Sequence, residues 1–147
     1  YALANYVYYH VLGKDEKNER FKLKYKLTAD DIKRINECTE INLNNDNCKA
    51  GCHYIAGIQN FRNLETLTIN NVGLCRLPGN LPETLTSLDV SNNSLTTIPQ
   101  LPKNLKELIL NNNCLDSLYN LPETLTTVEA SGNNIKSVKV FGINIQL

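Results

Sequence analysis

The chain of 147 residues contains no tryptophan and no methionine, and its five cysteines are an odd number without a repeating spacing. Such a set is not a disulfide framework, which favours a reducing compartment. Fifteen basic and fifteen acidic residues cancel, so composition gives no general attraction to nucleic acid or to an anionic membrane. No apolar run approaches the ~20 residues of a membrane-spanning helix. The start at Tyr1 predicts that the natural N-terminus lies upstream.

Three stretches nearly repeat one another at a period of 20 residues, and they begin at Leu85, Leu105 and Leu125. Each fits L-x-x-L-x-L-x-x-N-x-L, the pattern of a leucine-rich repeat, which is a stacking unit in a solenoid. Backward alignment adds one repeat that begins at Leu64 and a longer first repeat that begins at Cys38. The sequence therefore predicts an N-terminal cap over 1–37, five leucine-rich repeats over 38–138, and a C-terminal cap or truncated end over 139–147.

The predicted fold class is α/β, a leucine-rich-repeat solenoid with a parallel sheet on its concave face. Each L-x-L core is a short strand whose alternate side chains point inward. Leu-Pro pairs on the return path favour an extended or polyproline-like convex face, because proline breaks a helix interior. In the long first loop we expect Ile55, Ile58 and Phe61 on the buried side, and Cys38 and Cys48 fall in core columns.

Three asparagines, Asn93, Asn113 and Asn133, occupy the same position in consecutive repeats, where the chain turns inward. A buried amide at this position can hydrogen-bond backbone groups of the turn, and its loss should cost about 1–3 kcal/mol. In the first two repeats Asp46 and Val72 stand at the position instead. The pattern predicts a structural asparagine ladder over the last three repeats.

Residues 1–37 lie outside the repeat pattern, and the end of a solenoid needs a cap over its core. The apolar run over 1–12 predicts a buried helix. Strict alternation over 21–27 predicts a half-buried strand with Leu27 on its apolar face. The predicted cap is therefore rich in α-helix.

A second helix of this cap is predicted over 29–38. Thr28 and Asp31 have the spacing of a capping box, which opens a helix at its N-terminus. Within that helix we expect Ile32 and Ile35 to face inward.

The outward positions of the predicted strands form three columns on the concave face. They are Glu40, Thr66, Ser87, Glu107 and Thr127; Asn42, Thr68, Asp89, Ile109 and Glu129; and Asn44, Asn70, Ser91, Asn111 and Ser131. Every charge among them is negative, and Ile109 is expected to be an exposed apolar residue in their midst. The face is either a plain soluble surface or a binding site for a protein with a basic segment, and it would repel nucleic acid. The predicted protein-binding residues are Asp89, Glu107, Ile109, Glu129, Asn42, Thr68, Ser87 and Asn111.

The sequence predicts no catalytic residue, no metal site and no cofactor. The stretch 114–116 spells Cys-x-Asp, but its middle residue is a core leucine, and the aspartate opposes formation of a thiolate. The cysteines and histidine within 48–53 lack the closely paired ligands of a zinc site. The roles of Cys52, Cys75 and Cys114 stay open.

The unit from Leu81 to Pro99 resembles the LPX-type leucine-rich repeats of bacterial effector proteins. It matches L-P-x-x-L-x-x-L-x-V-x-x-N-x-L-x-x-[IL]-P almost position for position, and the resemblance covers about residues 64–138. That family includes type III secreted effectors of the IpaH/SspH and YopM kinds. The segment 55–71 is similar to the caps of internalin-like surface proteins. The resemblance implies a virulence effector that is secreted by a bacterium into the host cytoplasm and binds a host protein there.

Two alternatives stay open. In the first, the chain is the substrate-recognition domain of a bacterial ubiquitin ligase, whose helical catalytic domain with its own Cys-x-Asp would follow Leu147. In the second, the chain is a secreted or surface adhesin, which a signal peptide upstream of Tyr1 or a wall anchor downstream would indicate. None of the three predictions assigns a membrane or nucleic-acid partner to the chain.

Overall fold

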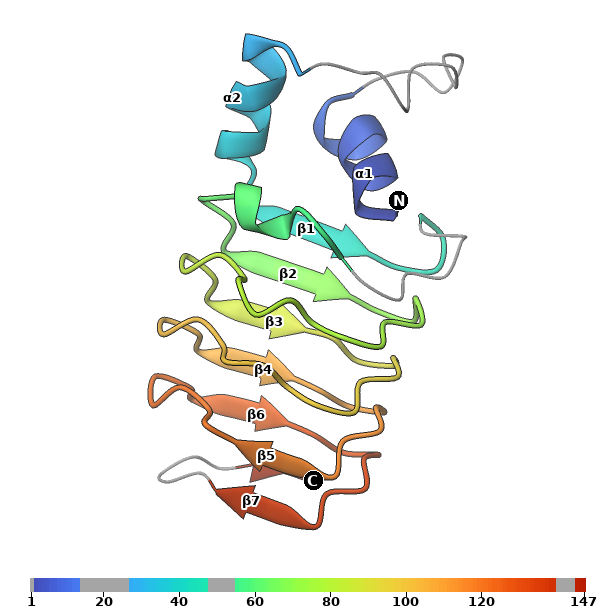
Figure 1. The fold of residues 1–147 in the computed structure, drawn as a ribbon, viewed down its shortest axis with the longest axis vertical. Coiled ribbons are helices and arrows are strands. Elements are labelled where there is room, and N and C mark those ends of the chain that lie inside the picture. The colour runs from blue at the N-terminus through green and yellow to red at the C-terminus, as the bar shows by residue number, and fades with distance from the viewer. Residues whose placement is uncertain (1, 14–26, 48–54, 140–144) are drawn as a thin grey trace.

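The computed structural model describes residues 2–13, 27–47, 55–139 and 145–147. In these residues the chain forms a parallel-strand solenoid with few helices (Figure 1). The predicted strand over 21–27 and the predicted core position of Cys48 lie outside the described residues, apart from Leu27, which is exposed.

The described residues contain a main sheet of six strands in the order β1-β2-β3-β4-β6-β8, and every neighbouring pair is parallel. Its strands are β1 (Glu40–Leu43), β2 (Thr66–Ile69), β3 (Ser87–Asp89), β4 (Glu107–Ile109), β6 (Thr127–Glu129) and β8 (Ile145–Gln146). A second parallel pair joins β5 (Ser117–Tyr119) to β7 (Ser137–Lys139). The strands stack along the long axis of the molecule (Figure 1).

The core lies on the inner side of the main sheet and follows from the leucine spacing. The register aligns Leu88, Leu108 and Val128, and all three side chains are fully buried. Leu118 of β5 is also fully buried and belongs to the same cluster. Because every repeat supplies apolar residues at the same positions, stacking buries one continuous core along the solenoid.

The longer first loop contributes the buried residues that its spacing predicted. Ile55 and Ile58 are fully buried, and Phe61 is nearly so. Ile58 begins the 3₁₀-helix η3 (Ile58–Asn60). Cys38, which was expected in a core column, is only partly buried against this core.

The turns that follow strands of the main sheet use left-handed backbone. Asn71, Asn92 and Asn112 have φ of 54°, 57° and 54°, and Gly132 has 70° at the same position of the next repeat. Asparagine and glycine tolerate this conformation better than other residues. Gly132 also leaves room for its neighbour, because a Cβ there would collide with Oδ1 of Asn112.

Helices lie at the β1 end of the solenoid (Figure 1). They are α1 (Ala2–Tyr6), the π-helix η1 (Val7–Val11) that continues it, and α2 (Ala29–Glu37). Leu3, Leu12 and Ile35 belong to the core cluster, and the backbone N–H of Asn42 in β1 donates to the Tyr6 hydroxyl at 3.2 Å. The helices therefore extend the core beyond the first strand.

Helix α2 begins as its sequence predicted. The Thr28 hydroxyl accepts from the Asp31 N–H at 3.2 Å, and the Asp31 carboxylate accepts from the Thr28 N–H at 3.0 Å. The prediction for Ile32 is wrong, since its side chain is 49% exposed. Ile35 is buried as predicted, and Asp31 is buried in place of Ile32, because residues four apart share one helix face and the capping carboxylate takes the inner position.

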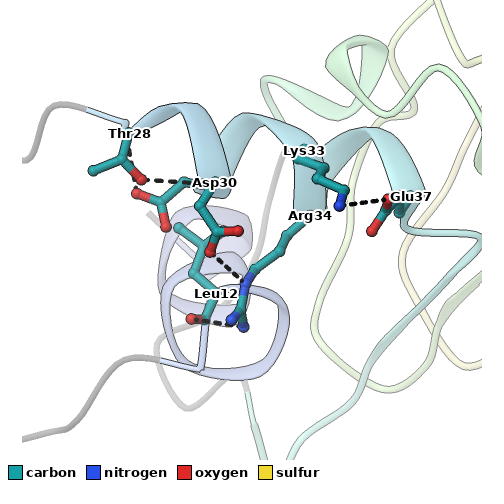
Figure 2. A network of polar contacts seen from close by, with 7 residues as sticks. Leu12, Thr28, Asp30, Lys33, Arg34 and Glu37 are labelled. Carbon is teal, nitrogen blue, oxygen red and sulfur yellow. Dashed lines mark hydrogen bonds and ion pairs between the residues drawn. The ribbon is translucent and has the colours of Figure 1, made fainter.

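Arg34 connects α2 to the first helical segment (Figure 2). Its Nη1 donates to the Leu12 carbonyl at 3.5 Å, and its Nε lies 3.0 Å from Oδ2 of Asp30. A second ion pair joins Lys33 and Glu37 at 3.8 Å on the exposed side of the helix. Both ion pairs are exposed, so they position side chains more than they stabilise the fold.

Candidate functional site

The outward side chains of the main sheet form the surface that we call the outer face. They stand at the first and third positions of β3, β4 and β6 and at the matching positions of β1 and β2. The register places Glu40, Thr66, Ser87, Glu107 and Thr127 in one row and Asn42, Thr68, Asp89, Ile109 and Glu129 in the next. Both rows have the membership that the sequence predicted.

The centre of the outer face is Ile109, with carboxylates on three sides. Asp89 and Glu129 are its partners on the two neighbouring strands, and Glu107 precedes it by two residues on β4. Neighbouring strands lie about 4.8 Å apart, and residues two apart along a strand are separated by about 6.7 Å. The three carboxylates therefore surround one apolar side chain within the reach of a single ligand segment.

Neutral hydrogen-bond donors hold each of these carboxylates. Ser87 Oγ donates to Oε2 of Glu107 at 2.8 Å, and Asn111 Nδ2 donates to Oε2 of Glu129 at 2.9 Å. A neutral donor orients a carboxylate without cancelling its charge. The described part of the chain contains no ion pair from a lysine or arginine to any carboxylate of this surface.

The Asp89 carboxylate is held by Ser91, which follows it by two residues. Its Oδ1 accepts from the N–H of Ser91 at 2.9 Å and from Ser91 Oγ at 2.5 Å. Ser91, which was expected to point outward, is buried as a result. Ile109 is half-buried and not exposed as expected, because Asp89 and Glu129 flank it on both sides.

The remaining predicted contacts lie around this centre. Thr68 is the partner of Asp89 on β2, and Asn42 is the partner of Thr68 on β1. The Asn42 backbone reaches Tyr6, so this residue lies where the outer face meets the helices. Asn111 links two turns as well as holding Glu129, because its Oδ1 accepts from the N–H of Ser131 at 2.9 Å.

The asparagines at the inward turn bind backbone groups of their own repeat and of the preceding one. Asn113 Nδ2 donates to the carbonyls of Val90 and Leu110 at 3.0 Å each, and its Oδ1 accepts from the N–H of Leu95 at 3.0 Å. Asn113 is itself buried. One side chain therefore satisfies backbone groups on two successive turns that the strands leave unpaired.

Asn93 and Asn133 make the equivalent bonds one repeat to either side. Asn93 Nδ2 donates to Ile69 and Val90 carbonyls at 2.7 and 2.9 Å, and Asn133 Nδ2 donates to Leu110 and Ala130 carbonyls at 2.9 and 3.0 Å. In the first repeat Asp46 is exposed, and the nearby amide that reaches a strand carbonyl belongs to Asn47, whose Nδ2 donates to Asn42 at 2.9 Å.

The described residues include three cysteines, Cys38, Cys75 and Cys114, and none of them is in a disulfide. Burial raises the pKa of the Cys38 thiol, whose Sγ donates to the Glu40 carbonyl at 3.3 Å. Cys75 and Cys114 are exposed. Among the described residues no group of three or more histidine, cysteine, aspartate or glutamate side chains could hold a metal ion.

Sequence reasoning missed a second surface, a hollow beside β5 lined by Gln100, Tyr119 and Asn120. The available signal was Tyr119, which stands where the two preceding repeats have Pro78 and Pro99. The repeat pattern does not predict the pairing of β5 with β7, and the hollow depends on where that pairing stops.

Comparison with known proteins gives no relative. A scan against models of protein families finds no match, and searches of curated proteins and of solved structures find none either. None of the helices in the described residues is long and apolar enough to cross a membrane.

Proposed function

We propose that this chain is a leucine-rich-repeat module that binds another protein through the outer face. The 20-residue period and the pattern L-x-x-L-x-L-x-x-N-x-L support the repeat assignment. The hydrogen bonds of Asn93, Asn113 and Asn133 support it too, because they give the asparagine of that pattern a structural role. The helices beside β1 then serve as the N-terminal cap of the array.

The observation that carries the proposal is the half-buried Ile109 with Asp89, Glu107 and Glu129 around it. Apolar contact at the centre and charge at the edge is the usual anatomy of a protein interface. The carboxylates are already oriented by neutral donors, so little side-chain order is lost when a partner binds.

The charge of the outer face defines the partner. Its charged residues are all acidic, although the whole chain carries no net charge. A partner with a basic segment would be attracted, whereas a nucleic acid would be repelled. Binding should weaken as salt is added, since exposed charges are screened.

The origin of the module is proposed from the repeat subtype. The unit from Leu81 to Pro99 resembles the LPX repeats of bacterial effectors, which supports a virulence effector that binds a host protein in the host cytoplasm. A bacterial ubiquitin ligase would use the same module for substrate recognition, with its catalytic cysteine in a domain outside this chain.

Affinity capture tests the binding face. The protein would be immobilised and exposed to a eukaryotic cell lysate beside the double variant Asp89→Lys/Glu129→Lys. We expect a protein that binds the original chain, is released by salt, and binds the double variant at least about tenfold more weakly. Equal melting temperatures would show that both proteins are folded.

The matched control is Asp116→Lys/Glu123→Lys, which changes the net charge equally but lies on the return path. It should retain the captured protein. Equal loss in both double variants would indicate a non-specific charge effect and would contradict the assignment of the outer face. Unchanged binding in the Asp89→Lys/Glu129→Lys variant would contradict it as well.

A further inference from the structure

A hollow of about 660 Å³ lies between the return paths of the third and fourth repeats. Its lining comes from 97–100 on one side and from β5 and Asn120 on the other. It is on the opposite side of the core from the outer face, because Leu118 of β5 points into the core and Ser117 and Tyr119 point away from it. A volume of this size falls within the range of small-molecule sites.

The hollow opens where backbone pairing stops. Between the fourth and fifth repeats, the Lys136 N–H donates to the Asp116 carbonyl at 2.8 Å and the pairing continues as β5 and β7. Between the third and fourth repeats, the Cys114 N–H donates to the Leu95 carbonyl at 2.8 Å, but in the described residues no strand pairing follows. Pro99 has no N–H to offer, so the ladder is not extended to it.

The lining is neutral and rich in hydrogen-bonding groups. The lining contributed by the described residues includes no charged side chain. Tyr119 exposes 44% of its surface, and its ring replaces the proline of the preceding repeats. The side-chain amides of Gln100 and Asn120 and the hydroxyl of Thr97 make no hydrogen bond with other described residues, unlike the carboxylates of the outer face.

We propose that this hollow binds a sugar ring of a neutral glycan. The ring of Tyr119 offers a flat apolar surface for the C–H face of the sugar, and its hydroxyl is a polar group at the edge. Gln100 and Asn120 each carry a donor and an acceptor, which is what a vicinal pair of hydroxyls requires. The absence of charge from this lining favours an uncharged ligand over a phosphate or a basic peptide.

A second hollow of about 300 Å³ adjoins the first and shares Gln100 and Asn120 with it. Its lining also includes Lys103 and Glu123, one of each sign. A disaccharide would therefore place one ring on Tyr119 and the other beside this pair, with the shared amides between them.

The test is an NMR titration of the ¹⁵N-labelled protein with four defined probes: maltose, cellobiose, lactose and N,N′-diacetylchitobiose. We expect at least one probe to shift the signals of Gln100, Tyr119 and Asn120 saturably, with a Kd of order 1 mM. The proposal is overturned if no probe shifts these signals, or if the shifts lie elsewhere. A titration with a proline-rich peptide that shifts them while the sugars do not would also overturn it.

Variants at the hollow separate binding from folding. Tyr119→Ala removes the exposed ring and keeps the backbone N–H of β5, so the fold should be retained while sugar affinity falls at least about tenfold. Asn120→Asp keeps the shape and suits the left-handed backbone at φ 53°, but it removes the amide donor and should also weaken binding. Asn134→Ala, at an exposed residue outside both hollows, should leave sugar binding unchanged, and equal loss there would contradict the site.

Discussion

At the scale of single residues, the asparagines at the inward turn contribute most to the shape of each repeat. Asn113 is buried and bonds two carbonyls and one N–H at 3.0 Å each, with a third carbonyl, that of Asn111, at 3.4 Å. No water can replace these bonds without opening the core. The Asn113 amide therefore takes the place of the backbone partners that these turns lack.

Asn113→Ala should lower the free energy of unfolding by about 2–4 kcal/mol, because it leaves several buried backbone groups unsatisfied. Denaturant unfolding followed by circular dichroism measures this loss. Asn134→Ala is the matched control, since Asn134 is exposed and its side chain makes no hydrogen bond with the described residues. A loss below about 0.5 kcal/mol for Asn113→Ala, similar to the control, would contradict the structural role.

At the scale of elements, α2 shows how local sequence sets a helix start. The reciprocal bonds of Thr28 and Asp31 satisfy two N–H groups that the first turn leaves unpaired. Asp30 and Arg34 lie one turn apart on the exposed side and contribute an ion pair that solvent screens.

Thr28→Ala should destabilise α2 by about 1 kcal/mol through loss of the N-cap. Asp30→Asn should cost less than about 0.5 kcal/mol, because the ion pair it weakens is exposed. Native-state hydrogen exchange of the α2 amides measures both changes. The reverse order of the two effects would show that the ion pair, and not the capping box, anchors the helix.

At the scale of the whole molecule, each strand of the main sheet packs mainly against its neighbours. Contacts run from β1 to β2 and onward through β3, β4 and β6 to β8, so stability is a sum over adjacent repeats. Turns and return paths also bond from one repeat to the next, so the two ends of the sheet are joined through the repeats between them. A substitution that destabilises a central strand should therefore affect the strands on one side of it more than those on the other.

Leu108→Ala removes a fully buried side chain from β4 and should cost about 2–5 kcal/mol. Because β6 and β8 reach the rest of the sheet through β4, their amides should lose protection before those of β1 and β2. Hydrogen exchange resolved by residue tests this order. Simultaneous loss of protection along the whole sheet would instead indicate a single cooperative unit.

The sequence alone determined the features that depend on spacing. A period of 20 residues places Ser87, Glu107 and Thr127 in one row, since stacked parallel strands repeat the same position. The three-residue spacing of Thr28 and Asp31 sets the capping box, which needs no distant contact. The inward asparagines follow from the same period.

The tertiary structure decided what depends on neighbours distant in the sequence. It turned Asp31 inward and Ile32 outward, because the face of a helix that is buried is chosen by what it packs against. It half-buried Ile109 between residues of two other strands. It also paired β5 with β7 but not with the segment around Pro99, and the hollow at Tyr119 lies where that pairing is absent. Spacing fixes which residues stand in a row, but only packing fixes how far each one is exposed.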